Sequence, residues 1–510
     1  MTPTVKRSHQ GCARCKRRRQ KCDERKPTCG RCSSAEVACE YKITLKWNGR
    51  VPREEKPSYH EESLVWRLDS HDSNNKLSKS EPVSHWTRGF NFFSLARSAL
   101  HLQQPSSVLT STSRLLLHHF ITETSKISSS PHIRDQICQA ILPMSHQSES
   151  LLYATMALSA LHRCTMLNEP PTRFIPESLV ADLIICSMRC LRRDLETPGY
   201  PVQPLLHTIR TLCHCEIFSG QANSFWRVHV NGAGAMFTEI VSRSDLDESE
   251  NSFWLWSRWF RSIRALSAVT DIGNLSGTAS RDLTTQDVDR SYFFDTYTGY
   301  SSDLNIVLME IGSLLHLKGL SDVRIASVET RNTIEQKAEE LKRSILYMIR
   351  RDTELGLKFP DQALITPETT FQFQACNTAY QYSGLIYLYR RVQGLPTSSN
   401  EVQGCVREIL NAVSSILPVT TLSPWILLTT PIYTAGCEAM AQDRNLVKEI
   451  LQDLYHALHI RNIMRALGLL EKRWEALDCS ESLSLDPLER PKGNISDAAD
   501  NSDWLDFIPY

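Results

Sequence analysis

The chain has 510 residues and a formal charge of zero, with 57 basic and 57 acidic side chains. It has no run of roughly eighteen apolar residues, which argues against a membrane-spanning helix. The charge is unevenly distributed, because residues 1–50 hold 14 Lys and Arg against 4 Asp and Glu, leaving 43 against 53 in residues 51–510. This division is typical of a nucleic-acid-binding module joined to a body that does not bind nucleic acid.

Six cysteines near the N-terminus follow the pattern C-x2-C-x6-C-x6-C-x2-C-x6-C. They are Cys12, Cys15, Cys22, Cys29, Cys32 and Cys39. Zinc accepts closed tetrahedral thiolate shells in structural sites. Two tetrahedral ions need eight metal–sulfur bonds, which six thiolates supply if two of them bridge both ions. The pattern therefore predicts a site for two zinc ions.

A disulfide framework and a copper–thiolate store are the alternatives for these cysteines. Residues 1–10 are polar and lack the apolar segment of a secretory signal. The other ten cysteines are scattered through apolar stretches, as expected for buried free thiols in a reducing compartment. Both observations favour zinc. A segment this short buries too little surface to fold unaided, so we expect its folding to require metal.

The residues between the cysteines are strongly basic. The candidate DNA contacts are Arg14, Lys16, Arg17, Arg18, Arg19 and Lys21. Each six-residue gap leaves room for one short helix, and a basic helix held by metal suits a groove of double-stranded DNA. A nuclear import signal is the alternative for residues 17–21, and the two roles are compatible. A metal-storage protein and an interaction scaffold are competing functions, and the basic helix argues against both.

The run CARCKRRRQKCDERKPTCGRC, within residues 9–42, resembles the fungal zinc binuclear cluster transcription factors. The resemblance implies that Cys12 and Cys29 are the bridging thiolates. It assigns one zinc to Cys12, Cys15, Cys22 and Cys29, and the other to Cys12, Cys29, Cys32 and Cys39. It also implies a nuclear, zinc-dependent, sequence-specific regulator of RNA polymerase II transcription, which is not an enzyme.

The same resemblance implies that the first helix of the cluster reads a CGG-type triplet in the major groove. The family usually carries Lys three positions before the third cysteine, whereas this chain carries Arg19, preceded by Arg18. Arginine can donate two hydrogen bonds to guanine O6 and N7, so the change is compatible with guanine recognition. The remaining basic residues of the segment are expected to contact phosphates.

Residues 43–110 are predicted to be a largely disordered linker. The stretch HDSNNKLSKSEPVSH has almost no apolar residues. The linker has no sustained heptad pattern, because SLVWRL is too short for a coiled coil. The sequence therefore leaves two alternatives open, binding as a monomer or pairing as a homodimer through the large domain.

Residues 111–474 carry a helical apolar pattern over a length sufficient for a large core. We predict an all-α domain of about twelve to sixteen helices in an irregular solenoid. Its segments SRLLLHHFITETS, SLLYATMALSALH and CEIFSGQANSFWRVHVNGAGAMF resemble the fungal-specific transcription factor domain. The resemblance implies a regulatory domain without catalytic activity, with roles in effector response and self-association.

Three features of this domain have functional alternatives. His207, Cys213, His214 and Cys215 could ligate a metal, but we favour buried core residues. The segment NGAGAM at residues 231–236 faintly suggests a phosphate loop, but it lacks a preceding strand and a following Lys-Ser/Thr, so close helix contact is favoured. The tryptophans at 254, 256 and 259 are expected in the core, with the lining of an effector pocket as the alternative.

Residues 475–510 are predicted to be an acidic-hydrophobic disordered tail. Near its end Asp503 and Asp506 alternate with apolar side chains, among them Trp504 and Phe507. Such alternation is the composition of an activation segment that binds a coactivator. The alternative is a tail that docks on its own helical domain, and the two roles are compatible.

Overall fold

The computed structural model describes residues 12–18, 20, 22–25, 28–35, 37, 39, 110–166, 177–220, 230–232, 234, 253–270, 292–322, 328–360, 365–418 and 422–483. The chain divides into two compact units, Met1–Leu77 and Ser78–Tyr510. Most of the predicted linker, residues 43–109, and the tail from residue 484 onward lie outside the described residues.

The first unit contains two short helices, α1 (Ala13–Arg17) and α2 (Gly30–Ser33), each of which directly follows a cysteine. The Cys29 side chain caps α2 by accepting a hydrogen bond from the backbone of Cys32. Among the described residues of this unit, the buried side chains are cysteines rather than aliphatic residues. A unit with such a centre depends on metal–sulfur bonds in place of an apolar core.

The second unit is built from α-helices, as the apolar pattern predicts, with thirteen of them among the described residues. The first five are α4 (Ser111–Thr122), α5 (Pro131–Gln147), α6 (Glu149–Met166), α7 (Glu177–Glu196) and α8 (Val202–Ser219). Helix α6 contacts the other four, which explains why its sequence is apolar on nearly every side. Thr110 and Ser130 cap α4 and α5, and Gly220 ends α8 with a positive φ of 60°.

The middle of the unit holds α10 (Phe253–Thr270), α12 (Leu304–Asp322), α13 (Val328–Glu354) and α14 (Pro367–Ile386), followed by a π-helical turn, Tyr387–Val392. A two-stranded antiparallel hairpin, β1 (Phe294–Asp295) and β2 (Tyr300–Ser301), lies between α10 and α12. It is the one sheet among the described residues. Each strand has only two residues, too few to show an alternating apolar pattern, so the hairpin was not predicted from the sequence.

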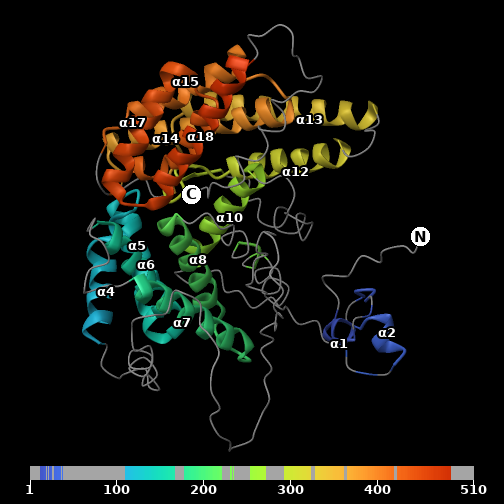
Figure 1. Ribbon diagram of the computed structural model, residues 1–510, viewed down its shortest axis with the longest axis vertical. Helices are drawn as coiled ribbons and strands as arrows, with labels where there is room; N and C mark the ends of the chain where they lie inside the picture. Colours follow the sequence, from blue (N-terminus) through green and yellow to red (C-terminus); the bar gives the residue numbers. More distant parts are fainter. Residues whose placement is uncertain are drawn as a thin grey trace, which may run out of the picture. The chain divides into compact units, whose positions relative to one another are not determined.

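The last helices are α15 (Asn400–Ser414), α16 (Thr429–Cys437), α17 (Ala441–Leu458) and α18 (Arg461–Leu483), with a 3-10 turn, η4 (Pro424–Leu427), before α16. In Figure 1 helices α4 to α8 form one end of this unit and α14 to α18 the other, with α10 between them. Helix α18 also contacts α8, so the two ends are joined directly.

Helix α18 continues to Leu483, beyond the predicted domain boundary at residue 474. The prediction of a disordered tail is therefore wrong for residues 475–483. Two contacts hold this last part of the helix: the Trp474 indole donates to the Gly436 carbonyl over 2.9 Å, and Arg444 pairs with Asp478 over 2.7 Å. The described helices include none that is long and apolar enough to cross a membrane.

Gly312 is expected to be required where α10 and α12 cross. A Cβ atom on Gly312 would lie 2.6 Å from the Cβ of Ala268 and 2.7 Å from its carbonyl oxygen. Gly312→Ala should therefore lower the free energy of unfolding by about 1–3 kcal/mol, because backbone atoms must move apart. The matched control is Gly404→Ala in α15, which has open space around it and should gain about 0.5–1 kcal/mol from helix propensity. Urea unfolding of both variants measures the free energy of unfolding. Equal changes in the two variants would contradict the close contact between Gly312 and Ala268.

Candidate metal centre

The six N-terminal cysteines converge on one point of the first unit. Five of them are buried, and Cys39 is half-buried. Helix α1 begins directly after Cys12 and helix α2 directly after Cys29, so these two side chains occupy equivalent places at the starts of the two helices. The structure thus brings together all six cysteines that the sequence predicted as one group.

The sulfur–sulfur distances fit tetrahedral zinc. Cys12 Sγ lies 3.7 Å from Cys29 Sγ and 3.6 Å from Cys32 Sγ, and Cys15 Sγ lies 3.8 Å from Cys29 Sγ. A tetrahedron with zinc–sulfur bonds of about 2.3 Å has edges of about 3.8 Å. A disulfide would need sulfurs about 2 Å apart, and all six cysteines are free thiols. The geometry therefore supports metal ligation and contradicts a disulfide framework.

The two halves of the site repeat the same backbone hydrogen bonds to sulfur. The N–H of Cys15 donates to Cys12 Sγ over 3.5 Å, and that of Cys32 donates to Cys29 Sγ over 3.4 Å. The N–H of Cys12 likewise donates to Cys22 Sγ over 3.4 Å, and that of Cys29 to Cys39 Sγ over 3.3 Å. The internal repeat of the sequence is thus also a repeat of the structure. Cys12 and Cys29 stand at equivalent positions and face each other.

The thiols of Cys12 and Cys29 have lowered pKa values. Burial is the largest single influence and acts to raise the pKa of each, but the hydrogen bonds to these sulfurs, from the backbone N–H of Cys15 or Cys32 and from neighbouring thiols, together lower the pKa. Burial raises the pKa of the Cys15 and Cys32 thiols. Cys12 and Cys29 therefore carry negative charge more readily than Cys15, Cys32 and Cys39, as suits a thiolate shared by two cations. Metal binding must displace thiol protons, so zinc affinity should fall as the pH falls.

Asp23 supports the second half of the site and was missed in the sequence analysis. Its carboxylate accepts the N–H of Gly30 over 3.1 Å and 2.9 Å at the start of α2. A Cβ atom on Gly30 would lie 2.8 Å from this carboxylate, so glycine leaves the room that the contact needs. The sequence signal for this contact was Asp23 directly after the third cysteine, together with Gly30 directly after the fourth.

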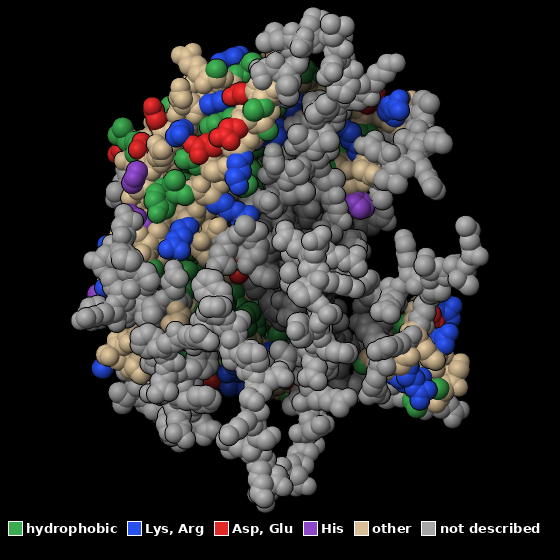
Figure 2. Space-filling view, in the orientation of Figure 1, with side chains coloured by type: hydrophobic (Ala, Val, Ile, Leu, Met, Phe, Trp, Pro, Cys, Tyr) green, Lys and Arg blue, Asp and Glu red, His purple; other side chains and the backbone are tan. Residues whose placement is uncertain are grey.

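The basic candidates differ in how the structure places them. Arg14 is half-exposed, and its Nη1 donates to the Arg31 carbonyl over 3.3 Å and lies 3.9 Å from Cys32 Sγ. Arg18 is exposed just after α1, while Lys16 and Arg17 belong to the helix. Arg19 and Lys21 lie outside the described residues. Figure 2 shows basic side chains gathered on the surface of the small unit.

The alternative sites of the helical unit are core features. Cys213 and Cys215 are buried, and His214 Nδ1 donates to the Arg210 carbonyl over 2.8 Å. Among the described residues, metal-ligand groupings occur at the N-terminal cysteines and involve none of these side chains. Gly234 of the glycine-rich segment is helical, and a Cβ there would lie 3.3 Å from Phe260. This supports close helix contact and argues against a phosphate loop.

Two family models match the chain. The fungal Zn(2)-Cys(6) binuclear cluster domain matches residues 10–48, and the fungal specific transcription factor domain matches residues 114–509. The cluster domain binds two zinc ions, as the cysteine pattern predicted.

Two curated relatives have regulatory names. The Pestheic acid cluster transcriptional regulator 3 of Pestalotiopsis fici is 25% identical over 44% of this chain and 48% of its own length. The lysine biosynthesis regulatory protein LYS14 of Saccharomyces cerevisiae is 53% identical over 8% of this chain and 6% of its own length. The matched segments thus span at most about half of these relatives. No solved structure matches. The chain belongs to the fungal transcription factors that combine a zinc binuclear cluster with the fungal specific transcription factor domain.

Proposed function

We propose that this protein regulates RNA polymerase II transcription in the nucleus by reading CGG-type triplets in double-stranded DNA. The observation that carries the proposal is a basic helix, α1, that begins directly after one cysteine of a two-zinc cluster. Metal bonds at both ends of the basic segment would hold it rigid for insertion into the major groove. The basic run at residues 17–21 would also serve nuclear import.

The six cysteines would hold the two zinc ions in a shared cluster. One ion would be bound by Cys12, Cys15, Cys22 and Cys29, and the other by Cys12, Cys29, Cys32 and Cys39. Two sulfur–sulfur distances support this division. Cys12 Sγ lies 3.6 Å from Cys32 Sγ, a terminal ligand of the second ion, and Cys29 Sγ lies 3.8 Å from Cys15 Sγ, a terminal ligand of the first ion. A bridging thiolate must lie close to the terminal ligands of both ions.

The basic side chains would divide between bases and phosphates. Arg18 and Arg19, which follow α1 in the sequence, would reach guanine edges, while Lys16, Arg17 and Lys21 would contact phosphates. Arg14 donates to the Arg31 carbonyl, so its main role would be to support the cluster, with a phosphate contact added on DNA.

Arg19→Ala should weaken binding to a CGG site by about 1–3 kcal/mol and leave binding to a scrambled site nearly unchanged. The physical reason is the loss of two hydrogen bonds to one guanine. The control is Arg25→Ala, which removes one charge from an exposed side chain of the same unit and should weaken both sites alike. Fluorescence anisotropy at physiological salt measures both. If Arg19→Ala lost the same affinity for the CGG site and for the scrambled site, the result would contradict a base contact by Arg19.

Residues 111–474 would regulate the DNA-binding unit, and the homodimer would form through this helical domain. The tail beyond α18, within residues 484–510, would contact a coactivator through its alternating acids and aromatics. One relative is named a lysine biosynthesis regulatory protein and the other a Pestheic acid cluster transcriptional regulator, which favours control of a set of biosynthetic genes as the biological role.

A further inference from the structure

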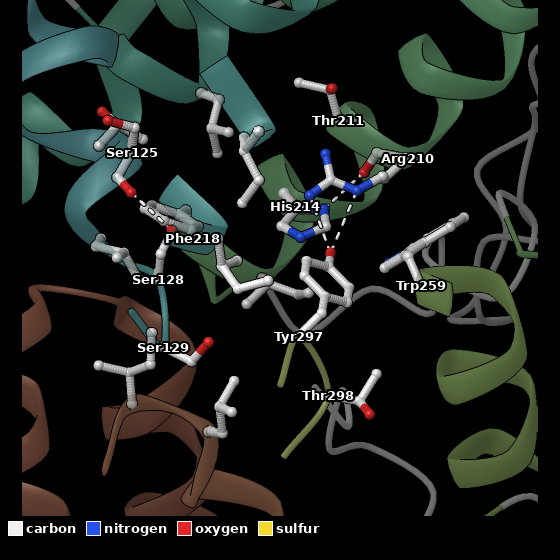
Figure 3. A pocket seen from close by; sticks show the side chains of 18 of the residues that line it. Ser125, Ser128, Ser129, Arg210, Thr211, His214, Phe218, Trp259, Tyr297 and Thr298 are labelled. Atoms are coloured by element: carbon white, nitrogen blue, oxygen red, sulfur yellow. Dashed lines mark hydrogen bonds between the residues drawn. The ribbon is translucent and has the colours of Figure 1, made fainter. Parts of the chain in front are cut away.

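A cavity of about 160 Å³ lies inside the helical domain, between its two ends. Isoleucines of α5, among them Ile133 and Ile137, form much of one wall. Arg210 and His214 of α8 lie on another, beside Tyr297 of the β1–β2 turn, which is hydrogen-bonded to Arg210 (Figure 3). The side chains of η4 complete the lining from the other end of the domain. A ligand in this space would touch both ends at once.

Arg210 is the one charged side chain among the residues that line the cavity, apart from the titratable His214. It is 6% exposed, and its Nε and Nη2 donate to the Tyr297 hydroxyl over 3.3 Å and 2.9 Å. No carboxylate lies at ion-pair distance from it within the described part of the chain, and Nη1 has no hydrogen-bond partner there. A buried charge without an opposite charge is costly, so this position favours an anion.

Several of the other polar groups in the lining of the cavity are already engaged. The hydroxyls of Ser125, Ser128 and Thr211 already donate to backbone carbonyls. Burial, with the nearby Arg210 charge, lowers the pKa of His214 to about 3, so the ring is neutral at physiological pH. Its Nδ1–H donates to the Arg210 carbonyl, which leaves Nε2 as an acceptor. The guanidinium fork of Nη1 and Nη2 is therefore the charged group of the lining that can bind an anion.

We propose that this cavity binds a small carboxylic acid with an apolar body, its carboxylate on Arg210 and its apolar part against the α5 isoleucines. A planar carboxylate matches the planar guanidinium fork. The size restricts the ligand to roughly one ring, since a cavity of about 150 Å³ holds benzene. The ligand would join the two ends of the helical domain, and this inference does not depend on how the cluster reads DNA.

Benzoate and its neutral analogue benzamide provide the test, titrated into the purified full-length protein by calorimetry. Benzoate should bind and raise the melting temperature. Benzamide should bind at least about tenfold more weakly, because it lacks the charge-assisted hydrogen bonds. No benzoate binding at millimolar concentration, or equal binding of benzamide, would overturn the proposal.

Three variants locate the site. Arg210→Met should weaken benzoate binding at least about tenfold without lowering the melting temperature, since it removes a buried charge that no carboxylate of the described residues pairs with. Ile137→Phe should fill the apolar side and also weaken binding, with Arg210 intact. The control is Arg264→Met, which removes an arginine that stacks on Phe260 outside the cavity and should bind as the parent does. Unchanged binding in both cavity variants, or equal loss in the control, would contradict this location.

Discussion

Cys12→Ser should remove both zinc ions from the full-length protein, whereas Cys39→Ser should remove one. Under the proposed assignment Cys12 belongs to both tetrahedra, so its loss leaves each ion with three sulfurs and no bridge on that side. Cys39 belongs to one tetrahedron and is the least buried of the six. Elemental analysis of zinc per chain measures the difference, together with binding to a CGG site, which should be lost entirely in Cys12→Ser.

The matched control is Cys138→Ser, because Cys138 is a half-buried cysteine of the helical domain and should leave the zinc content unchanged. Zinc loss of the same size in Cys12→Ser and Cys39→Ser would contradict the bridging assignment. Retention of two ions in Cys12→Ser would place the bridge on another cysteine.

Asp352→Ala should destabilise the helical domain by about 3–5 kcal/mol. The Asp352 side chain is 1% exposed and pairs with Arg351 over 2.7 Å. Its other oxygen accepts from Ser301, Asn377 and Gln381 over 3.1, 2.8 and 2.8 Å. Removing this carboxylate leaves three buried donors without this acceptor and leaves Asp303 as the carboxylate that still pairs with the buried Arg351. It also removes the hydrogen bond that joins Ser301 of the hairpin to α13. Urea unfolding followed by far-UV circular dichroism measures the change.

The comparison is Glu471→Ala, which breaks an ion pair with Lys448 at 2.6 Å between side chains that are 40% and 46% exposed. Solvent screens that pair, so its loss should cost less than about 1 kcal/mol. Similar losses of unfolding free energy in Asp352→Ala and Glu471→Ala would show that Asp352 is not the acceptor that joins the hairpin, α13 and α14.

The helical class was predictable because long amphipathic and apolar stretches determine it locally. Helix α4 begins at Ser111 because Thr110 caps it, and Ser130 followed by Pro131 starts α5 in the same way. The β1–β2 hairpin was not predictable, since its two-residue strands depend on partners far along the chain, such as Asn377 bonding to the Ser301 N–H. The helical part of residues 475–483 was missed because its support, the Arg444–Asp478 pair, is also distant in sequence.

The metal centre was predictable because six ligands with regular spacing lie within one short segment. What the spacing could not show is the support around it: the Asp23 contact with Gly30, and the turn of Arg14 toward the Arg31 carbonyl. Trp259, one of the tryptophans for which the sequence left an effector pocket as the alternative, lines this cavity, whereas Arg210 had no signal in the sequence. The lining of the cavity comes from α4, α5, α6, α8, α10, α14, the hairpin turn, η4 and neighbouring segments, and those elements meet only in the folded domain.

Binding selection on random double-stranded DNA, with the zinc content of the same full-length preparation, tests the central claim most directly. The account predicts two zinc ions per chain and enrichment of a CGG triplet at physiological salt, with both lost after chelation. Two zinc ions with salt-sensitive binding that enriches no sequence would contradict it, because the cluster would then hold phosphates without reading bases.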